Sequence, residues 1–193
     1  MSKSSGDNDT VLTVPRTGWA ASFLVRLKLE PRLEPDDVDA LADELLRKDV
    51  LDALEEAVDL ARPHESISRQ LRHALELLRD GEFVLAWPPL ATAVEGLYWE
   101  EAIRTGFVDP ESLRTSSGQA ARSAHDIFEA LPINERVRRM LSRYAFGSEA
   151  NAFRHGWRAA WGERHQCAIW LLALITWFDG YGWRYFNSSE LRS

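Results

Sequence analysis

Hydrophobic residues recur along most of the chain every three or four positions, which is the spacing of one face of an α-helix. Over 38–62 this pattern predicts one or two amphipathic helices, which begin after Pro35-Asp36-Asp37 and are ended by Pro63. Over 64–80 it predicts another helix, closed by Asp80-Gly81. The first half of the chain is therefore expected to be helical.

The second half continues the same pattern. A long helix is predicted over 82–105, with a kink or a break at Pro88-Pro89 because proline cannot donate a helical hydrogen bond. Residues 110–132 are predicted to hold two short helices, 134–144 another, and 163–181 an apolar final helix. No stretch alternates with the period of a β-strand. The fold class is therefore predicted to be all-α, as a four- to five-helix bundle behind an acidic helical N-terminal extension.

The length of 193 residues fits one domain with an appendage. We expect a disordered polar tail over 1–18 and an acidic helical region over 19–62. The helical bundle itself is expected over 63–187, followed by a short tail over 188–193.

Charge is distributed unevenly. The net charge of −7 argues against indiscriminate binding to nucleic acid or to anionic membranes. Residues 28–63 hold twelve acidic side chains against five basic ones, whereas residues 133–165 hold seven arginines against three glutamates. The acidic helices could cover the arginine-rich segment or dock a basic partner protein. The arginine-rich segment could bind an anion at one place.

Cys167 is the only cysteine, so no intrachain disulfide can form, which fits a reducing cytoplasm. It lies in an apolar run and is predicted to be a small buried hydrophobic residue. The N-terminal residues lack the apolar core of a signal peptide. The longest apolar run, 167–178, is too short to span a bilayer. A cytoplasmic protein with no membrane association is expected.

The best candidate for a chemical site is Asn151-Ala152-Phe153-Arg154-His155-Gly156. Asn151 and His155 are four residues apart and would share one face of a helical turn, which Gly156 then ends. Trp157 and Trp161 follow, and either indole could stack on a base or pack against the bundle.

The order of these parts resembles the HEPN superfamily, the small helical bundles of bacterial toxins, abortive-infection systems and other antiviral defence proteins. The resemblance covers about residues 64–181. It rests on the junction Leu78-Arg79-Asp80-Gly81-Glu82-Phe83, on a long helix with Ala93-Val94-Glu95-Gly96-Leu97, and on Asn-x-x-x-His-Gly before an apolar final helix.

Membership would imply a homodimer that cuts RNA without a metal ion, with the two motifs facing each other across a cleft. The resemblance assigns His155 as the catalytic acid or base and Asn151 as the orienting polar group. The family's arginine is absent, because Ser148, Glu149 and Ala150 occupy its allowed positions. Phosphate contacts would have to come from other arginines, for which the candidates are Arg154, Arg158 and Arg143.

Two alternatives remain open. A catalytically silent HEPN-like module would bind a partner protein or a nucleotide, and a helical scaffold would use 151–156 only as a turn. A metal site is not expected, because His165 and Cys167 point to different sides of a helix and no further thiol completes a zinc set. No cofactor is expected either. Glu95 is predicted to pair with Arg143 or Arg154 if it faces the core.

Overall fold

The computed structural model describes residues 38–111, 114–115, 142 and 163–178. These residues form five α-helices and one short pair of strands, so the predicted all-α class is confirmed for this part of the chain. The helices in chain order are α2 (Val38–Leu45), α3 (Lys48–Ala61), α4 (Glu65–Arg79), α5 (Phe83–Arg104) and α9 (Glu163–Trp177).

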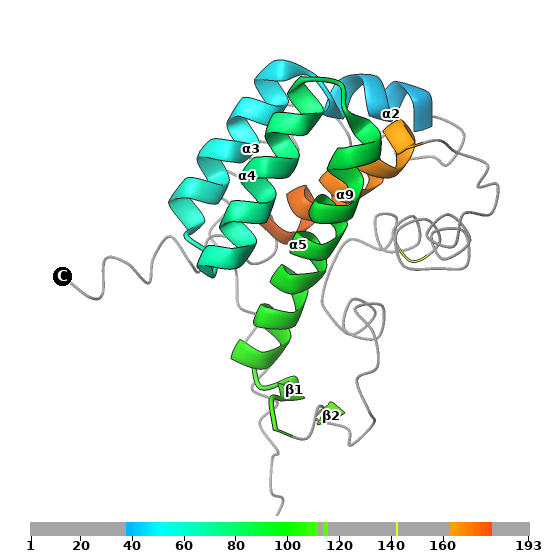
Figure 1. Cartoon of the computed structure of the whole chain (residues 1–193). Helices are drawn as coiled ribbons and strands as arrows, with labels where there is room; N and C mark the ends of the chain where they lie inside the picture. The colour runs from blue at the N-terminus through cyan, green and yellow to red at the C-terminus, as the bar shows by residue number, and fades with distance from the viewer. Residues whose placement is uncertain (1–37, 112–113, 116–141, 143–162, 179–193) are drawn as a thin grey trace, which may run out of the picture.

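The five helices pack around one continuous core (Figure 1). Helix α3 packs on α4, α4 on α5, and α9 on both α5 and α2. Apolar residues that recur at helical spacing, such as Leu41 of α2, Leu54 of α3 and Leu71 of α4, are buried in this core. On α5 Leu90 is buried as well, whereas Ile103 near the end of the helix is exposed. The helices α2 and α3 of the acidic region thus share their core with the bundle.

The segment 38–62 forms two helices, with the break at Leu46-Arg47. Arg47 is extended and precedes the first turn of α3. Its guanidinium binds Glu44 before the break at 3.0 Å and Asp49 after it at 2.5 Å. Both pairs lie at the surface, so the backbone groups that the break leaves without helical partners can bind water.

Helix α5 runs without a break through Pro88 and Pro89, so of the predicted kink or break, the break does not occur. The two prolines remove the hydrogen bonds that the carbonyls of Val84 and Leu85 would accept in a regular helix. Both of these residues are exposed, with 60% and 58% of their surface accessible. Water can therefore replace the missing donors at little cost. Before the helix, Gly81 adopts a positive φ of 77°, which permits the sharp turn out of α4.

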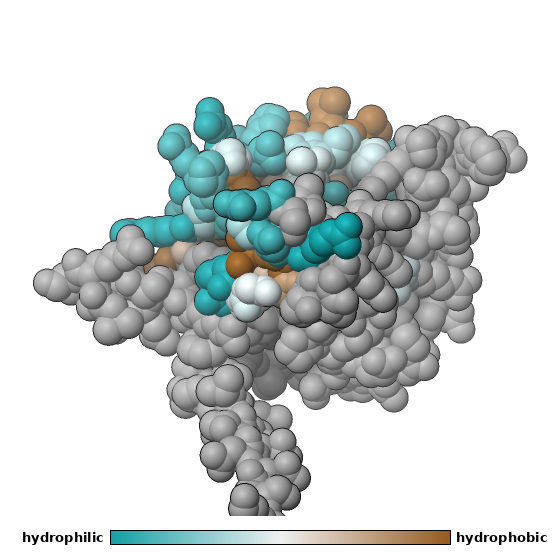
Figure 2. Space-filling model, turned by 90° about the horizontal axis from the view of Figure 1, so that it is seen from below, coloured by the Kyte–Doolittle hydropathy of each residue, from teal (hydrophilic) through white to brown (hydrophobic). Residues whose placement is uncertain are grey.

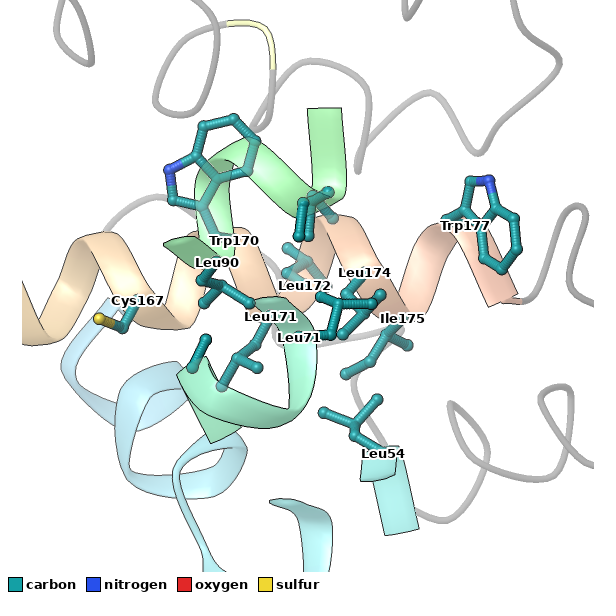
Figure 3. Packing of buried hydrophobic residues seen from close by; sticks show 14 of the residues in the cluster. Leu54, Leu71, Leu90, Cys167, Trp170, Leu171, Leu172, Leu174, Ile175 and Trp177 are labelled. Atoms are coloured by element: carbon teal, nitrogen blue, oxygen red, sulfur yellow. The ribbon is translucent and has the colours of Figure 1, made fainter. Parts of the chain in front are cut away.

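Helix α9 is the centre of the core. Every residue from Gln166 to Phe178 is buried, and apolar residues occupy all of its faces rather than one stripe. Leu54 of α3, Leu71 of α4 and Leu90 of α5 gather with it in the same cluster (Figure 3). Trp170, Leu174 and Trp177 are at most 1% exposed, so this face of α9 belongs to the core of one subunit.

Helix α5 is joined to α9 by a buried hydrogen bond. The Tyr98 hydroxyl donates to the carbonyl of Ala173 at 2.9 Å, in the C-terminal half of both helices. After α5 the chain forms a small antiparallel ladder of β1 (Val108–Asp109) and β2 (Arg114–Thr115). A two-residue ladder is too short to produce a period in the sequence, so it was not predicted. No helix in the described part of the chain combines the length and apolarity that crossing a bilayer requires.

Helices α4 and α5 approach closely at Gly96. A Cβ atom at this position would lie 3.1 Å from Cδ1 of Ile67 and 3.3 Å from its Cγ1. We expect Gly96→Val to lower the free energy of unfolding by about 1–3 kcal/mol, because the branched side chain overpacks this contact. Chemical denaturation measures the change. Adding Ile67→Ala should recover part of the loss, and equal losses in both backgrounds would contradict the close contact.

Candidate functional site

The residues that the sequence singles out for chemistry, Asn151, His155, Arg154, Arg158 and Arg143, lie outside the described residues. Among the described residues, Ser142 adjoins Arg143, and Glu163 begins α9 seven residues after Gly156. The start of α9 is thus the described helix that follows the motif in the chain. Glu163, Arg164 and His165 form its first turn.

Two basic side chains at the start of α9 bind two carboxylates of α2. The Arg164 guanidinium donates to Asp43, and His165 Nε2 lies 2.6 Å from Asp39 Oδ1. The members of each pair are more than 120 residues apart in the chain, at separations of 121 and 126. Helix α2 lies beside the first turns of α9 in Figure 1. The acidic and arginine-rich segments of the sequence therefore meet here.

The positions of these four side chains follow from the spacing of polar and apolar residues on α2 and α9. On α2, Asp39 and Asp43 are four residues apart and share one face, while Leu41, Ala42 and Leu45 are buried in the core. On α9, Arg164 and His165 belong to the last polar turn before the buried run begins at Gln166. Cations are unfavourable at the N-terminal end of a helix, so the facing carboxylates offset that cost.

Most other carboxylates of the acidic helices are also paired within the chain. Arg79 of α4 binds Asp52 at 2.9 Å and also Glu55, and Arg72 of α4 binds Asp59 at 2.7 Å. Burial opposes the charge of Arg79, but the two carboxylates outweigh it and raise its pKa. The acidic character of α2 and α3 is thus largely matched by their neighbours, which leaves less free negative charge for a basic partner than the sequence suggests.

Cys167 lies two residues beyond His165 and is buried, as predicted. Its thiol points to the carbonyl of Phe83 at 3.5 Å. Burial, with a smaller contribution from the charge of Glu163, raises the pKa of Cys167 to about 12. A thiol of this kind is neither a nucleophile nor a metal ligand near neutral pH.

A second group of polar residues lies where α4 begins. His64 caps this helix: its Nδ1 accepts from the backbone N–H of Ser66 at 3.4 Å and lies 2.8 Å from the Ser66 hydroxyl. Burial raises the pKa of Glu100 on the adjacent α5, and the backbone N–H and the charge of His64 act in the opposite direction. The side chain of His64 thus satisfies a backbone N–H at the start of α4, and its position is explained without a chemical role.

Two further glutamates of α5 lie near the core. Glu95 is half-buried, and its predicted partners Arg143 and Arg154 lie beyond the described residues. Glu101 is fully buried, and Arg104 binds it at 2.5 Å. Sequence reasoning did not identify Glu101, because a single glutamate between Glu100 and Ala102 carries no distinguishing pattern.

Within the ranges that the structure describes, histidine, cysteine and acidic side chains nowhere gather in a group of three or more that could hold a metal ion.

Comparisons of the chain with protein-family models, with curated proteins and with solved structures find no match. The function is therefore inferred from the residues themselves. At the start of α9, two basic side chains are held at the surface by carboxylates of α2.

Proposed function

We propose that this chain is a HEPN-like protein of a bacterial defence or toxin–antitoxin system and that it cuts RNA without a metal ion. The observation that carries the proposal is Asn151-x-x-x-His155-Gly156 directly before an apolar final helix. The central position of α9 in the core is compatible with this order of parts. In this proposal the protein acts in the cytoplasm as a homodimer whose two motifs line one cleft.

The reaction needs no protein nucleophile. The 2′-hydroxyl of the ribose attacks the adjacent phosphorus and loses its proton, while the bond from phosphorus to the 5′-oxygen of the next nucleotide breaks and that oxygen gains a proton. The products are a 2′,3′-cyclic phosphate and a 5′-hydroxyl. His155 would move one of these protons, since imidazole titrates near neutral pH.

Asn151 would orient the reacting group through its side-chain amide. The charge that builds on the phosphate in the transition state would be stabilised by guanidinium groups, for which Arg154, Arg158 and Arg143 are the candidates. Arg154 is adjacent to His155 and departs from the family's spacing. Arg143 precedes the motif and Arg158 follows it in the sequence.

The test is incubation of the purified protein with total RNA in the presence of EDTA, compared with His155→Ala. Cleavage by the wild type that is lost in the variant supports the ribonuclease. Light scattering after size exclusion measures the mass in solution. A monomer at concentrations that cleave RNA would contradict the cleft between two subunits.

The second candidate is a catalytically silent HEPN-like module that binds a partner protein or a nucleotide. The observation that favours it is the absence of arginine from Ser148, Glu149 and Ala150. In this case neither the wild type nor His155→Ala cuts RNA, and a stable complex with a defined partner is recovered from the source cell.

A further inference from the structure

Arg164 and His165 are basic residues at the start of α9, and both contact carboxylates of α2. Arg164 lies nine residues after His155 in the chain. The pairs Arg164–Asp43 and His165–Asp39 place a carboxylate against each basic side chain. A carboxylate and a phosphate compete for such groups because both present anionic oxygens.

The two halves of each pair differ in exposure. The side chains of Arg164 and His165 are 36% and 22% exposed, so they are partly embedded in the protein. The side chains of Asp43 and Asp39 are 72% and 89% exposed. The two basic side chains are therefore the more deeply embedded members of the pairs, and the carboxylates are the more exposed members.

The carboxylates can also be displaced without unfolding. Ion pairs at the surface contribute little to stability, so a polyanion can replace an aspartate at small cost. Helix α2 is held separately by the buried side chains of Leu41, Ala42 and Leu45. Rotation of two short aspartate side chains would separate them from Arg164 and His165 while the helix stays in place.

Arg79 provides the contrast. Its side chain is only 20% exposed and binds two carboxylates, Asp52 and Glu55, from the neighbouring helix α3. Two carboxylates, of which Glu55 is only 33% exposed, therefore hold the guanidinium of Arg79. Arg164 shares the chemistry of Arg79 but has a more exposed carboxylate as its partner.

We propose that Arg164 and His165 form a contact pair for the phosphate backbone of RNA, and that Asp39 and Asp43 of α2 cover it as an intramolecular competitor. This inference rests on the proposed function, since it takes RNA as the ligand. The acidic helix would then set the affinity for RNA and prevent indiscriminate binding. It would act through two carboxylates and not through its overall charge.

The experiment measures binding and not cleavage. A fluorescent single-stranded RNA of about 20 nucleotides is titrated with the full chain carrying His155→Ala, so that the probe stays intact. In this background, Asp39→Asn with Asp43→Asn is expected to bind roughly fivefold more tightly, because two weak competing pairs are lost. The slope of log Kd against log salt should steepen by between about 0.7 and 1.4, for one or two additional phosphate contacts.

Two matched variants separate this effect from simpler ones. Glu56→Gln with Glu111→Gln makes the same change in net charge at exposed glutamates of the described surface, and it should leave binding nearly unchanged. Arg164→Gln breaks the same pair as Asp43→Asn but removes the guanidinium, so adding it should remove the part of the gain that comes from Arg164. Thermal unfolding of each variant reports whether α2 still packs on the core.

Each result decides the inference. An equal gain from Glu56→Gln with Glu111→Gln would show a net-charge effect, and a gain that Arg164→Gln leaves undiminished would show a loosened helix. Either one overturns the proposal, as does unchanged binding in Asp39→Asn with Asp43→Asn. Cleavage by the wild type together with unchanged binding would remove only this inference. A gain that depends on Arg164, without any cleavage, would remove only the catalytic proposal.

Discussion

Replacing His155 with alanine is expected to lower the rate of RNA cleavage in EDTA by about 100-fold or more, which is the usual contribution of a positioned acid or base. Asn151, His155 and Gly156 stand in this order before the final helix. Histidine is the residue type of this motif whose side chain ordinarily changes charge near pH 7. The initial rate of release of a 5′-hydroxyl product from a short RNA measures the effect.

His73→Ala is the matched control. His73 is an exposed histidine of α4, so its removal makes the same chemical change away from the motif. It should cut RNA at the wild-type rate. Equal losses in the two variants would point to a damaged fold or a contaminating nuclease, and equal activity in the His155 variant and the wild type would sink the assignment of His155.

The arginines are tested in the same assay. If one of them supplies the missing phosphate contact, replacing that arginine by glutamine should lower cleavage, whereas replacing the others should not. Arg154, Arg158 and Arg143 are the three candidates. A guanidinium that stabilises only the transition state lowers kcat and kcat/KM together, while one that only binds substrate raises KM.

The helices of the described core could be predicted because their signals are local. Leu71 and Leu75 repeat with the helical spacing and are fully buried, and Asp80-Gly81 ends α4 as expected. The all-round burial of α9 follows in the same way from its continuous apolar run. The failure at Pro88-Pro89 is also physical: a proline breaks a helix only where the lost hydrogen bond cannot be replaced, and the exposure of Val84 and Leu85 depends on tertiary structure.

The contacts between distant segments could not be predicted individually. Charge counts indicated that an acidic region and a basic region could meet, but not that Asp43 would bind Arg164 across 121 residues. Such a pairing depends on the packing of α2 against α9, which is decided by many apolar residues at once. Similarly, the sequence around Glu101 does not distinguish it from its neighbour Glu100, although Glu101 is fully buried and Glu100 is not.

Cys167 is expected to react with iodoacetamide roughly 1000-fold more slowly in the native protein than in the unfolded chain at neutral pH. The attacking species is the thiolate, and raising the pKa from an ordinary value of 9.0 to about 12 lowers the thiolate fraction by that factor. Burial between α9 and the Phe83 carbonyl adds a steric barrier. Mass spectrometry of the alkylated chain, with and without denaturant, measures the two rates. Rapid labelling of the native protein would contradict the packing of α9.

The same pKa shift makes stability depend on pH. In alkali the unfolded thiol loses its proton above about pH 9, while the folded thiol keeps it until about pH 12. Unfolding then releases a proton, so the free energy of unfolding should fall with rising pH, by about 1.4 kcal/mol per unit in this window. No such contribution should exist below it.

Cys167→Ala removes the contribution of the thiol while leaving those of lysine and tyrosine. The difference in slope between wild type and variant at pH 10–11, measured by urea denaturation, isolates it. Parallel slopes would show that the thiol is reached by water in the native state, and the central place of α9 in the core would have to be abandoned.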